Sequence, residues 1–509
     1  MNLPAPFTEY TRALLGNEEY EKLSAALEQE PPVSIRLNPS FLTDANSPNS
    51  PISLLSSPVS PVPWCPEGHY LGQRLTFTFD PLFHAGCYYV QEASSMFVGQ
   101  ALKQYVSEEP VVMLDLCAAP GGKSTHACSL LPEGSLLVAN EVIRNRSQIL
   151  AENLTKWGYP GVVVTNNDPS DFPRLGAFFD VILTDVPCSG EGMFRKDPGA
   201  VEEWSPENVE ICWQRQRRII ADIWPCLKPG GILVYSTCTY NTKEDEENVQ
   251  WIRDEFGAEV LPVNAPGGWG ITGNLLAAAD FPVYRFLPHK TIGEGFFLAV
   301  LRKPEAERQG GIVTVNREVT ACGAMNEKLS RKKTAAARNN SKPSSAPMGK
   351  EQIAVAKSWL LSPEDFEVSV NGSFITAFPK EYTGECSVLQ RYLRIVQAGV
   401  VLGEVKGKDL IPNHALAMSP LLLRTEAFAS EEIGYEQAIA YLRKEAITLP
   451  ATAPRGYVLL TYRKVPLGFV KNIGNRANNL YPQEWRICPM RYAFCDDDSG
   501  IGTVRLLLG

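Results

Sequence analysis

The sequence predicts an α/β fold whose core is a parallel sheet flanked by helices. Between about residue 100 and residue 303, short apolar runs alternate with segments of helical periodicity, which is typical of such sheets. The first run leads into a Gly-rich turn, and acidic residues follow the first four runs. The runs are VVMLDL (111–116), SLLVAN (135–140), GVVVTNN (161–167), FDVILTDV (179–186) and GILVYST (231–237).

The chain should form several parts, because 509 residues exceed what one hydrophobic core usually organises. We predict an N-terminal cap at 1–95, the α/β domain at 96–303, a basic flexible linker at 304–352 and an α+β region at 353–509. Within the cap we expect short helices in residues 1–30, a strand at 33–40 and a surface loop at 41–63. In the last region we expect a helix at 435–445 and strands at 455–462 and 465–473.

Composition indicates a globular, soluble chain, with 44% hydrophobic and 21% charged residues. No stretch resembles a signal peptide or a membrane span, so we expect a cytoplasmic protein without a membrane partner. The 12 cysteines show no paired Cys-x-x-Cys spacing, which favours free thiols in a reducing compartment and predicts no metal site. We expect a monomer.

Charge argues against indiscriminate nucleic-acid binding, since the formal net charge is −9. Seven basic residues and no acidic one lie between Lys328 and Lys350, so the rest of the chain is more acidic still. Any nucleic acid would therefore be recognised through particular basic patches.

A ligand loop is predicted in LDLCAAPGGKSTHA, residues 114–127. Gly121 and Gly122 allow the backbone to approach a ligand, and the following helix offers unpaired N–H groups. A phosphate-binding P-loop is disfavoured, because the spacing G-x-x-x-x-G-K-[ST] is absent.

Four acids mark the ends of successive strands: Asp115, Glu141, Asp168 and Asp185. In a doubly wound sheet such positions line the crevice that holds a nucleotide-type ligand, and Glu141 is placed to accept hydrogen bonds from ribose hydroxyls. Each acid alone could be a solvated loop residue or a helix cap. Their recurrence beside a Gly-rich turn favours the ligand site.

Two strand ends carry cysteines, in TDVPCSGEGMFRKDP (184–198), which contains Asp185, and in YSTCTYN (235–241). If these strands are neighbours, Asp185, Cys188 and Cys238 converge at one rim. Methylation of cytosine carbon 5 needs a nucleophile at carbon 6, and a thiolate meets that need. We expect a helix soon after Cys238, with Asn241 or Thr242 as N-cap and an acidic first turn at 244–246. The N-terminus of such a helix would favour the thiolate form of Cys238, and the acids would partly offset that effect. The alternative is that these are buried structural cysteines.

Four motifs in order resemble the RNA cytosine-C5 methyltransferases of the NOL1/NOP2/Sun type. They are DLCAAPGGK, DVPCSGEGMFRKDP, GGILVYSTCTYN and RFLPHKTIGEGFF, and the resemblance covers roughly residues 1–303. The C-terminal segments LRIVQAGVVLGEVKGKDLIPNHALAMS and PLGFVKNIGNRANNLYPQEWRI are similar to the bacterial small-subunit rRNA methyltransferase F group, which ends in a PUA-like domain.

The resemblance implies a Rossmann-like methyltransferase core, S-adenosylmethionine as cofactor, and methylation of cytosine carbon 5 in RNA, most simply rRNA. It makes Cys238 the nucleophile and Cys188 the residue that assists product release. It places Asp185 beside both cofactor and cytosine, with Lys123 supporting that charge cluster. Cofactor contacts fall on Cys117, Ala118, Ala119, Pro120, Gly121, Gly122, Lys123, Glu141, Arg146, Asp168 and Asp185.

One departure from the family pattern leaves a second assignment open. After Cys238 the usual Glu-Asn-Glu reads Glu247-Asn248-Val249, which matches the Glu-Asn-Val of DNA cytosine methyltransferases. In that scheme Cys188 would attack and Glu247 would contact the base. The motifs are also compatible with a tRNA substrate and with a non-catalytic RNA-binding ribosome assembly factor. A small-molecule methyltransferase is disfavoured by the long C-terminal region.

RNA contacts in the C-terminal region are predicted where basic and aromatic residues interleave within a short stretch. An unstacked base can lie on aromatic side chains while cations bind its phosphates. The alternative is an ordinary sheet surface with a buried Trp. The predicted contacts are Lys471, Arg476, Tyr481, Trp485 and Arg486.

Overall fold

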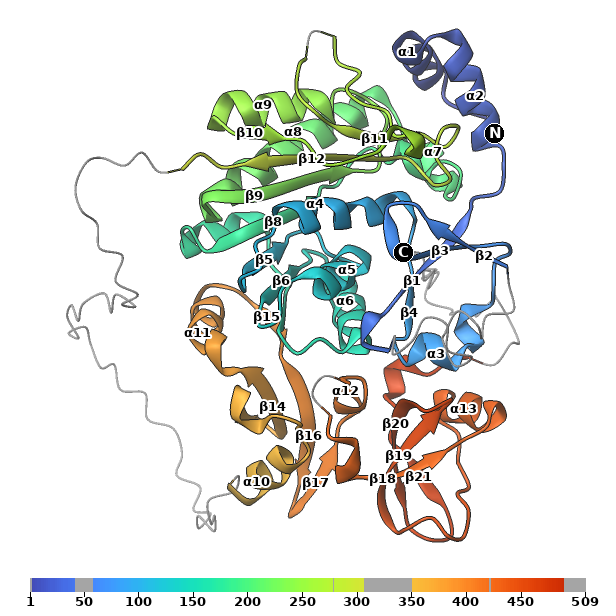
Figure 1. Ribbon diagram of the computed structural model, residues 1–509, viewed down its shortest axis with the longest axis vertical. Coiled ribbons are helices and arrows are strands. Elements are labelled where there is room, and N and C mark those ends of the chain that lie inside the picture. Colours follow the sequence, from blue (N-terminus) through green and yellow to red (C-terminus); the bar gives the residue numbers. More distant parts are fainter. Residues whose placement is uncertain (1, 42–57, 278, 306–349, 421–422, 489–509) are drawn as a thin grey trace, which may run out of the picture.

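A computed structural model of the protein describes residues 2–41, 58–277, 279–305, 350–420 and 423–488 (Figure 1). Most of the predicted linker and most of the predicted surface loop at 41–63 lie outside these residues. The structure differs from the predicted bounds of the loop and of the linker in one place each. The loop ends earlier than expected, because a strand begins at Val59, and the linker ends at a helix that begins at Lys350.

A nine-stranded sheet forms the centre of the molecule and confirms the predicted α/β fold. Its middle strands β9, β8, β5, β6 and β7 are parallel neighbours, whereas β10, β11, β12 and β15 pair antiparallel. The order is β10 (Glu259–Leu261), β12 (Phe296–Arg302), β9 (Leu227–Thr237), β8 (Phe179–Asp185), β5 (Val112–Asp115), β6 (Leu136–Asn140), β7 (Val162–Thr165) and β15 (Ile395–Ala398), with β11 (Tyr284–Phe286) on β12.

Helices cover both faces of this sheet, because alternate strand residues point to opposite sides and both sets are apolar. One face packs on α4 (Val98–Tyr105), α5 (Gly122–Leu130) and α6 (Arg144–Trp157). The other packs on α8 (Pro206–Ile223), α9 (Glu246–Phe256) and α11 (Thr383–Tyr392). The short helix α7 (Pro198–Glu203) precedes α8. None of the described helices combines the length and apolar character that a membrane span requires.

The N-terminal part has the expected helices, α1 (Ala5–Leu15) and α2 (Asn17–Leu27). Its sheet has the order β2 (Val59–Val62), β3 (Cys65–Leu71), β1 (Val33–Leu37) and β4 (Tyr88–Val90). The short helix α3 (Pro81–His84) precedes β4 in the chain. Buried Arg36 ties this sheet to the core, because its guanidinium donates to Thr125 Oγ1 of α5 at 2.6 Å and to Gln91 Oε1 at 2.8 Å.

The C-terminal part forms two further sheets, which lie below the central domain in Figure 1. The first contains β13 (Phe366–Asn371), β14 (Phe374–Pro379), β16 (Val400–Lys406) and β17 (Asp409–Pro412), with α10 (Lys350–Ser358) and α12 (His414–Ala417). The second contains β18 (Ala429–Glu432), β19 (Gly456–Tyr462), β20 (Val465–Asn472) and β21 (Ala477–Asn479), with α13 (Tyr435–Leu442). The predicted helix and both predicted strands of this region are present.

One strand of the C-terminal part joins the central sheet instead. β15 pairs antiparallel with β7, with Ile395 opposite Thr165 and Ala398 opposite Val163. The α/β domain is therefore completed by residues far beyond its predicted end at 303. The division of the chain into four parts remains our proposal.

Candidate active site

The predicted ligand loop connects β5 to α5, and α6 fixes its shape. Arg146 Nη2 donates to the carbonyl oxygen of Ala119 at 2.8 Å, and Asn153 Nδ2 donates to that of Pro120 at 2.8 Å. Gly121 has φ +119°, and a Cβ there would lie 3.3 Å from Leu150 Cδ1. The turn therefore needs glycine, and its carbonyl groups are held by side chains of the neighbouring helix.

Asp115 lies at the start of this loop and is completely buried. Its Oδ2 accepts a hydrogen bond from Ser124 Oγ at 2.6 Å, whereas Oδ1 has no partner among the described residues. Burial raises the pKa of Asp115 to about 7. An unpartnered carboxylate oxygen in such a place suits a cationic ligand group.

Glu141 and Asp168 lie at the ends of β6 and β7, as predicted. The buried Glu141 carboxylate accepts from the Ile143 amide at 2.8 Å and forms an ion pair with Arg146 at 3.2 Å. Asp168 is half exposed and accepts from the amide of Ser170, a bond that lowers its pKa.

Sequence analysis missed Asn140, which holds these strand ends together. Its amide donates to the carbonyl oxygens of Leu116 and Asn167 and its Oδ1 accepts from Thr165. A polar residue that ends a buried apolar strand was the available signal.

Asp185 and Lys123 link the ligand loop to the neighbouring strand ends. Lys123 Nζ donates to Asp185 Oδ2 at 2.9 Å, and Ser236 Oγ donates to Asp185 Oδ1 at 2.8 Å. Burial alone would lower the pKa of Lys123, but the charge and the hydrogen bond of Asp185, together with the charge of Asp115, outweigh burial and raise it. Lys123 also lies close enough to Cys238 for their charges to interact. The pair therefore connects the loop with the cysteines.

Cys188 and Cys238 converge as the sequence predicts. Asp185 of β8 is opposite Ser236 of β9, so the loops after both strands leave the same edge of the sheet. The two sulfur atoms are 3.2 Å apart, and the backbone amide of Cys238 donates to Cys188 Sγ at 3.4 Å. Its hydrogen bond with Cys238, together with burial, raises the pKa of Cys188 well above the usual value for a thiol.

Cys238 is accessible in a segment that is otherwise closed. Its side chain is partly exposed, whereas Thr237 and Thr239 on either side are completely buried. This is the opposite of what a structural cysteine would show, because such a thiol would be packed in the interior.

A network of buried polar groups holds the two cysteine loops together. Glu244 accepts from the amide of Ser189 at 3.0 Å, from Gln216 at 2.7 Å and from Asn241 at 2.8 Å. Burial raises the pKa of Glu244 to about 7. Glu191 adds a second link, accepting from the amide of Tyr240 at 2.8 Å.

The helix expected soon after Cys238 is present as α9, but neither Asn241 nor Thr242 is its N-cap, because the helix begins later than predicted. α9 begins at Glu246, so Glu244 and Asp245 lie in a turn before the helix and only Glu246 belongs to its first turn; all three are completely buried. Asp245 Oδ2 lies 2.9 Å from the guanidinium of Arg285, which also pairs with Glu246. Asp245 and Glu246 are therefore paired with a buried cation, and the N-terminus of α9 lies eight residues after Cys238 in the chain.

Known proteins with similar sequences identify the family of this chain. Ribosomal RNA small subunit methyltransferase F of Cronobacter sakazakii is 31% identical over 436 residues, and 84% of each chain is covered. The protein of the same name from Salmonella heidelberg is 31% identical over 446 residues, again with 84% of each covered. The chain belongs to this methyltransferase F family.

Models of three protein families match successive parts of this methyltransferase F chain. Residues 3–93 match the N-terminal domain of 16S rRNA methyltransferase RsmF, residues 102–302 match 16S rRNA methyltransferase RsmB/F, and residues 429–487 match the methyltransferase RsmF PUA domain. The crystal structure of NSun6 from Pyrococcus horikoshii with SFG shares the fold, with a TM-score of 0.51 and 24% identity over 60% of this chain and 99% of that one.

S-adenosylmethionine is the cofactor of a methyltransferase F protein, and the residues present fit it. The donor carries an ammonium and a sulfonium group, which suit the buried and unpartnered Asp115 Oδ1. The close-approach glycine at Gly121 and the acid at Glu141 suit its backbone and ribose contacts.

The assignment of Cys188 as nucleophile, with Glu247 on the base, gains no support. Asn248 of the Glu-Asn-Val sequence is buried and bonds Gln216 and Tyr235. Glu247 interacts electrostatically with Arg217 of α8. The motif therefore lies in the first turns of α9 and contacts α8, in the helical layer.

The C-terminal residues predicted to contact RNA do not form one exposed patch. Tyr481 is completely buried against His414 and Tyr441, so the prediction that it stacks on a base is wrong. Trp485 is half-buried, with Lys156 over its ring at 5.2 Å. Lys471 pairs with Asp409, and Arg476 and Arg486 are exposed. Aromatic spacing alone could not distinguish a stacking surface from a core.

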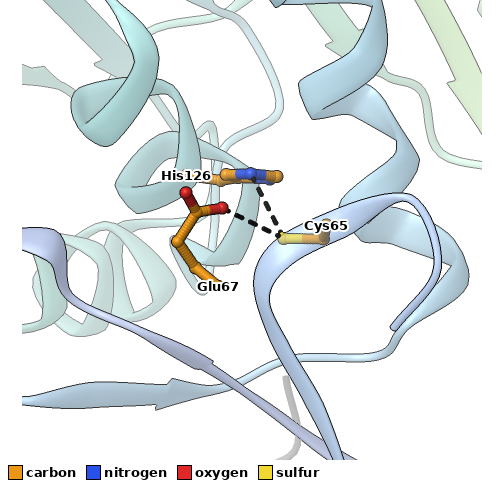
Figure 2. A group of neighbouring side chains, drawn as sticks. All are labelled: Cys65, Glu67 and His126. Atoms are coloured by element: carbon orange, nitrogen blue, oxygen red, sulfur yellow. Dashed lines mark hydrogen bonds between the residues drawn. The ribbon is translucent and has the colours of Figure 1, made fainter. Parts of the chain in front are cut away.

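A group of possible metal ligands lies away from the cysteine pair, although the sequence predicts no metal site. Cys65 Sγ is 3.7 Å from Glu67 Oε2 and 3.9 Å from His126 Nε2 (Figure 2). Burial raises the pKa of Cys65 to about 11 and lowers that of His126, so both are neutral at pH 7. Buried Arg36, whose charge acts on both, further opposes a cation here. We describe the group as a thiol–imidazole contact.

Proposed function

We propose that this protein methylates carbon 5 of a cytosine in small-subunit rRNA, with Cys238 as the nucleophile. The observation that carries the proposal is the pair of thiols, 3.2 Å apart, beside the Asp185–Lys123 ion pair. The curated relatives act on ribosomal RNA of the small subunit by name, which supports the choice of substrate.

The cofactor-binding role belongs, in this proposal, to the loop from Cys117 to Lys123, with Glu141, Asp168 and Asp185. Glu141 would accept hydrogen bonds from the ribose hydroxyls, and Asp115 would pair with the ammonium group. Arg146 acts indirectly, because its guanidinium fixes Glu141 and the carbonyl of Ala119. When bound, S-adenosylmethionine supplies an electrophilic methyl group.

Cys238 begins the reaction by adding its thiolate to carbon 6 of the cytosine. Cys238 is assigned the attack because it is the cysteine of the Thr-Cys motif, and a protonated Cys188, whose pKa is raised by their hydrogen bond and by burial, fits the role of its partner. Forming the S–C6 bond moves electron density onto carbon 5, where the methyl group is then accepted.

Cys188 completes the reaction by accepting the proton from carbon 5. Once Cys238 is bonded to carbon, its charge and its hydrogen bond no longer hold the proton on Cys188, which can ionise to solvent and act as base. Removal of the carbon-5 proton restores the ring double bond and breaks the S–C6 bond.

Asp185 positions the base. Each of its oxygens has one described side-chain partner, Lys123 or Ser236, and about one-third of its side chain is exposed. A carboxylate oxygen can accept more than one hydrogen bond, so Asp185 can bind the N4 amino group or a protonated N3 of cytosine.

RNA recognition is assigned to the N-terminal cap and the C-terminal PUA domain, with Arg476 and Arg486 as exposed cations of the latter. We further propose that the protein acts as a monomer in the cytoplasm and needs no metal. The target cytosine must be unstacked to expose carbon 6.

Two alanine variants test the proposal with purified small-subunit rRNA and labelled methyl donor. Cys238→Ala should abolish methylation while leaving donor affinity nearly unchanged. Cys188→Ala should accumulate a covalent protein–RNA adduct, seen as a shifted band on a denaturing gel. An adduct in Cys238→Ala and none in Cys188→Ala would reverse the roles.

Bisulfite mapping of cellular RNA with and without the gene identifies the cytosine, and modification of tRNA alone would exclude rRNA as substrate.

A further inference from the structure

A pocket lies between the N-terminal cap and the catalytic domain, beside the cofactor loop. It has a volume of about 540 Å³. The cap contributes residues 74–78, Phe83, Tyr89 and Val90, and the catalytic domain contributes Ala119, Pro120 and three residues of α6. We infer that this pocket holds one unstacked nucleotide of the RNA substrate. The inference rests on the proposed function, because it presumes an RNA substrate.

The charge of the pocket suits a phosphate. Its described lining includes two arginines, Arg74 and Arg146, and no acidic residue, in a chain whose net charge is −9; because Arg146 is already paired with Glu141, Arg74 is the cation assigned to a phosphate. Arg74 is exposed, and half of the Arg146 side chain is exposed. Arginine binds phosphate oxygens in a bidentate manner. Its guanidinium group is weakly hydrated, so removing its water on binding costs little free energy.

The walls of the pocket suit a base. Phe77 and Phe83 are half-buried, and their rings are supported from the core side by Tyr88 at 6.1 and 5.8 Å. Ile149 of α6, with 38% of its surface exposed, adds an apolar side. Rings that are fixed on one side and accessible on the other form a stacking platform that tolerates any base.

Polar groups of the pocket are already held in place. Asn153 Nδ2 donates to Pro120 O at 2.8 Å and to the Tyr89 hydroxyl at 3.4 Å, so one side chain joins cap, cofactor loop and α6. Thr76 and Thr78 also line the pocket. These groups would contact sugar or base edges without reorganisation.

The position of the pocket explains why a nucleotide would be needed there. Ala119 and Pro120 belong to the cofactor loop and also line this pocket, so an occupant is anchored next to the methyl donor. A cytosine leaves its stack only if the energy of unstacking is offset. A neighbouring nucleotide stacked on Phe77 and bound by Arg74 would supply that offset.

Adenosine of the methyl donor has similar chemistry, so the experiment must separate donor from RNA. We would compare Arg74→Glu and Phe77→Leu with wild type and with Arg391→Glu, a control at an exposed arginine on α11. Binding of a fluorescein-labelled small-subunit rRNA fragment is measured by anisotropy, and binding of S-adenosylmethionine by calorimetry.

The pocket variants should bind the RNA fragment about 5- to 100-fold more weakly, as expected for loss of one stacked base or one phosphate contact. Donor affinity should stay within about twofold, and Phe77→Tyr should restore RNA binding. RNA affinity equal to that of the control, or a parallel loss of donor affinity, would overturn the inference. Melting temperatures close to wild type confirm that each variant is folded.

The two proposals fail in different ways. If the RNA fragment does not accept a methyl group or form an adduct in Cys188→Ala, the proposed function fails whatever the pocket variants show. If the adduct forms at saturating RNA and the pocket variants bind normally, only the pocket assignment fails.

Discussion

Arg285 should be a major source of stability for the segment that carries Cys238. Its completely buried guanidinium lies 2.9 Å from Asp245, pairs with Glu246, and donates to the carbonyl of Tyr240 at 2.7 Å. Arg285→Met leaves two buried carboxylates without a cation, and loss of one partner of a buried pair costs about 3–5 kcal/mol. For a unit of this size, each kcal/mol lowers the melting temperature by about 2–4 °C, so we expect a loss of roughly 6–20 °C.

Scanning calorimetry of the intact chain measures this effect. Arg302→Met is a matched control, because Arg302 and Glu259 are 3.5 Å apart with 41% and 67% of their side chains exposed. Such a surface pair contributes less than about 1 kcal/mol. The reasoning is refuted if Arg285→Met melts within about 2 °C of the control, since the buried acids would then be stable without their cation.

Two further predictions concern charges around the cofactor loop. Lys123→Met removes the hydrogen bond to Asp185, and a hydrogen bond to a charged group contributes about 1.5–3 kcal/mol. We therefore expect kcat/KM to fall by roughly 10- to 100-fold in a labelled-donor assay. A fall of less than about threefold would contradict this expectation. Asp115 has a folded-state pKa of about 7 against an ordinary 3.8, so between these values the folded protein holds a proton that the unfolded chain has lost. Raising the pH from about 5 to 8 should therefore destabilise the donor-free wild type, and the melting temperature of Asp115→Asn should rise relative to it. A difference that does not vary with pH would show that Asp115 is ionised throughout.

The parts of the fold that depend on local pattern were predictable. Five apolar runs, four of them with an acid at the end, indicated the five parallel strands, and placing two of those strands side by side was enough to bring Cys188 and Cys238 together. β15 was not predictable, because its pairing with β7 joins residues more than 200 positions apart and leaves no local signature.

Burial was the other quantity that the sequence could not supply. Asp245 and Glu246 resemble the acidic first turn of an exposed helix, but Arg285, some 40 residues later, makes their burial possible. Tyr481 resembles an RNA-stacking residue, but His414 and Tyr441 enclose it. In both cases the deciding partner is distant in sequence, and only the tertiary structure identifies it.

The strand β15 links completion of the catalytic fold to synthesis of the chain as far as residue 398. Without it, β7 would present a row of unpaired backbone groups, and such an edge invites pairing with other chains. During synthesis the five parallel strands emerge first, and their open margin is sealed only when Ile395–Ala398 leaves the ribosome. A product of premature termination would therefore carry a complete set of cysteines and cofactor-loop residues on a sheet prone to self-association.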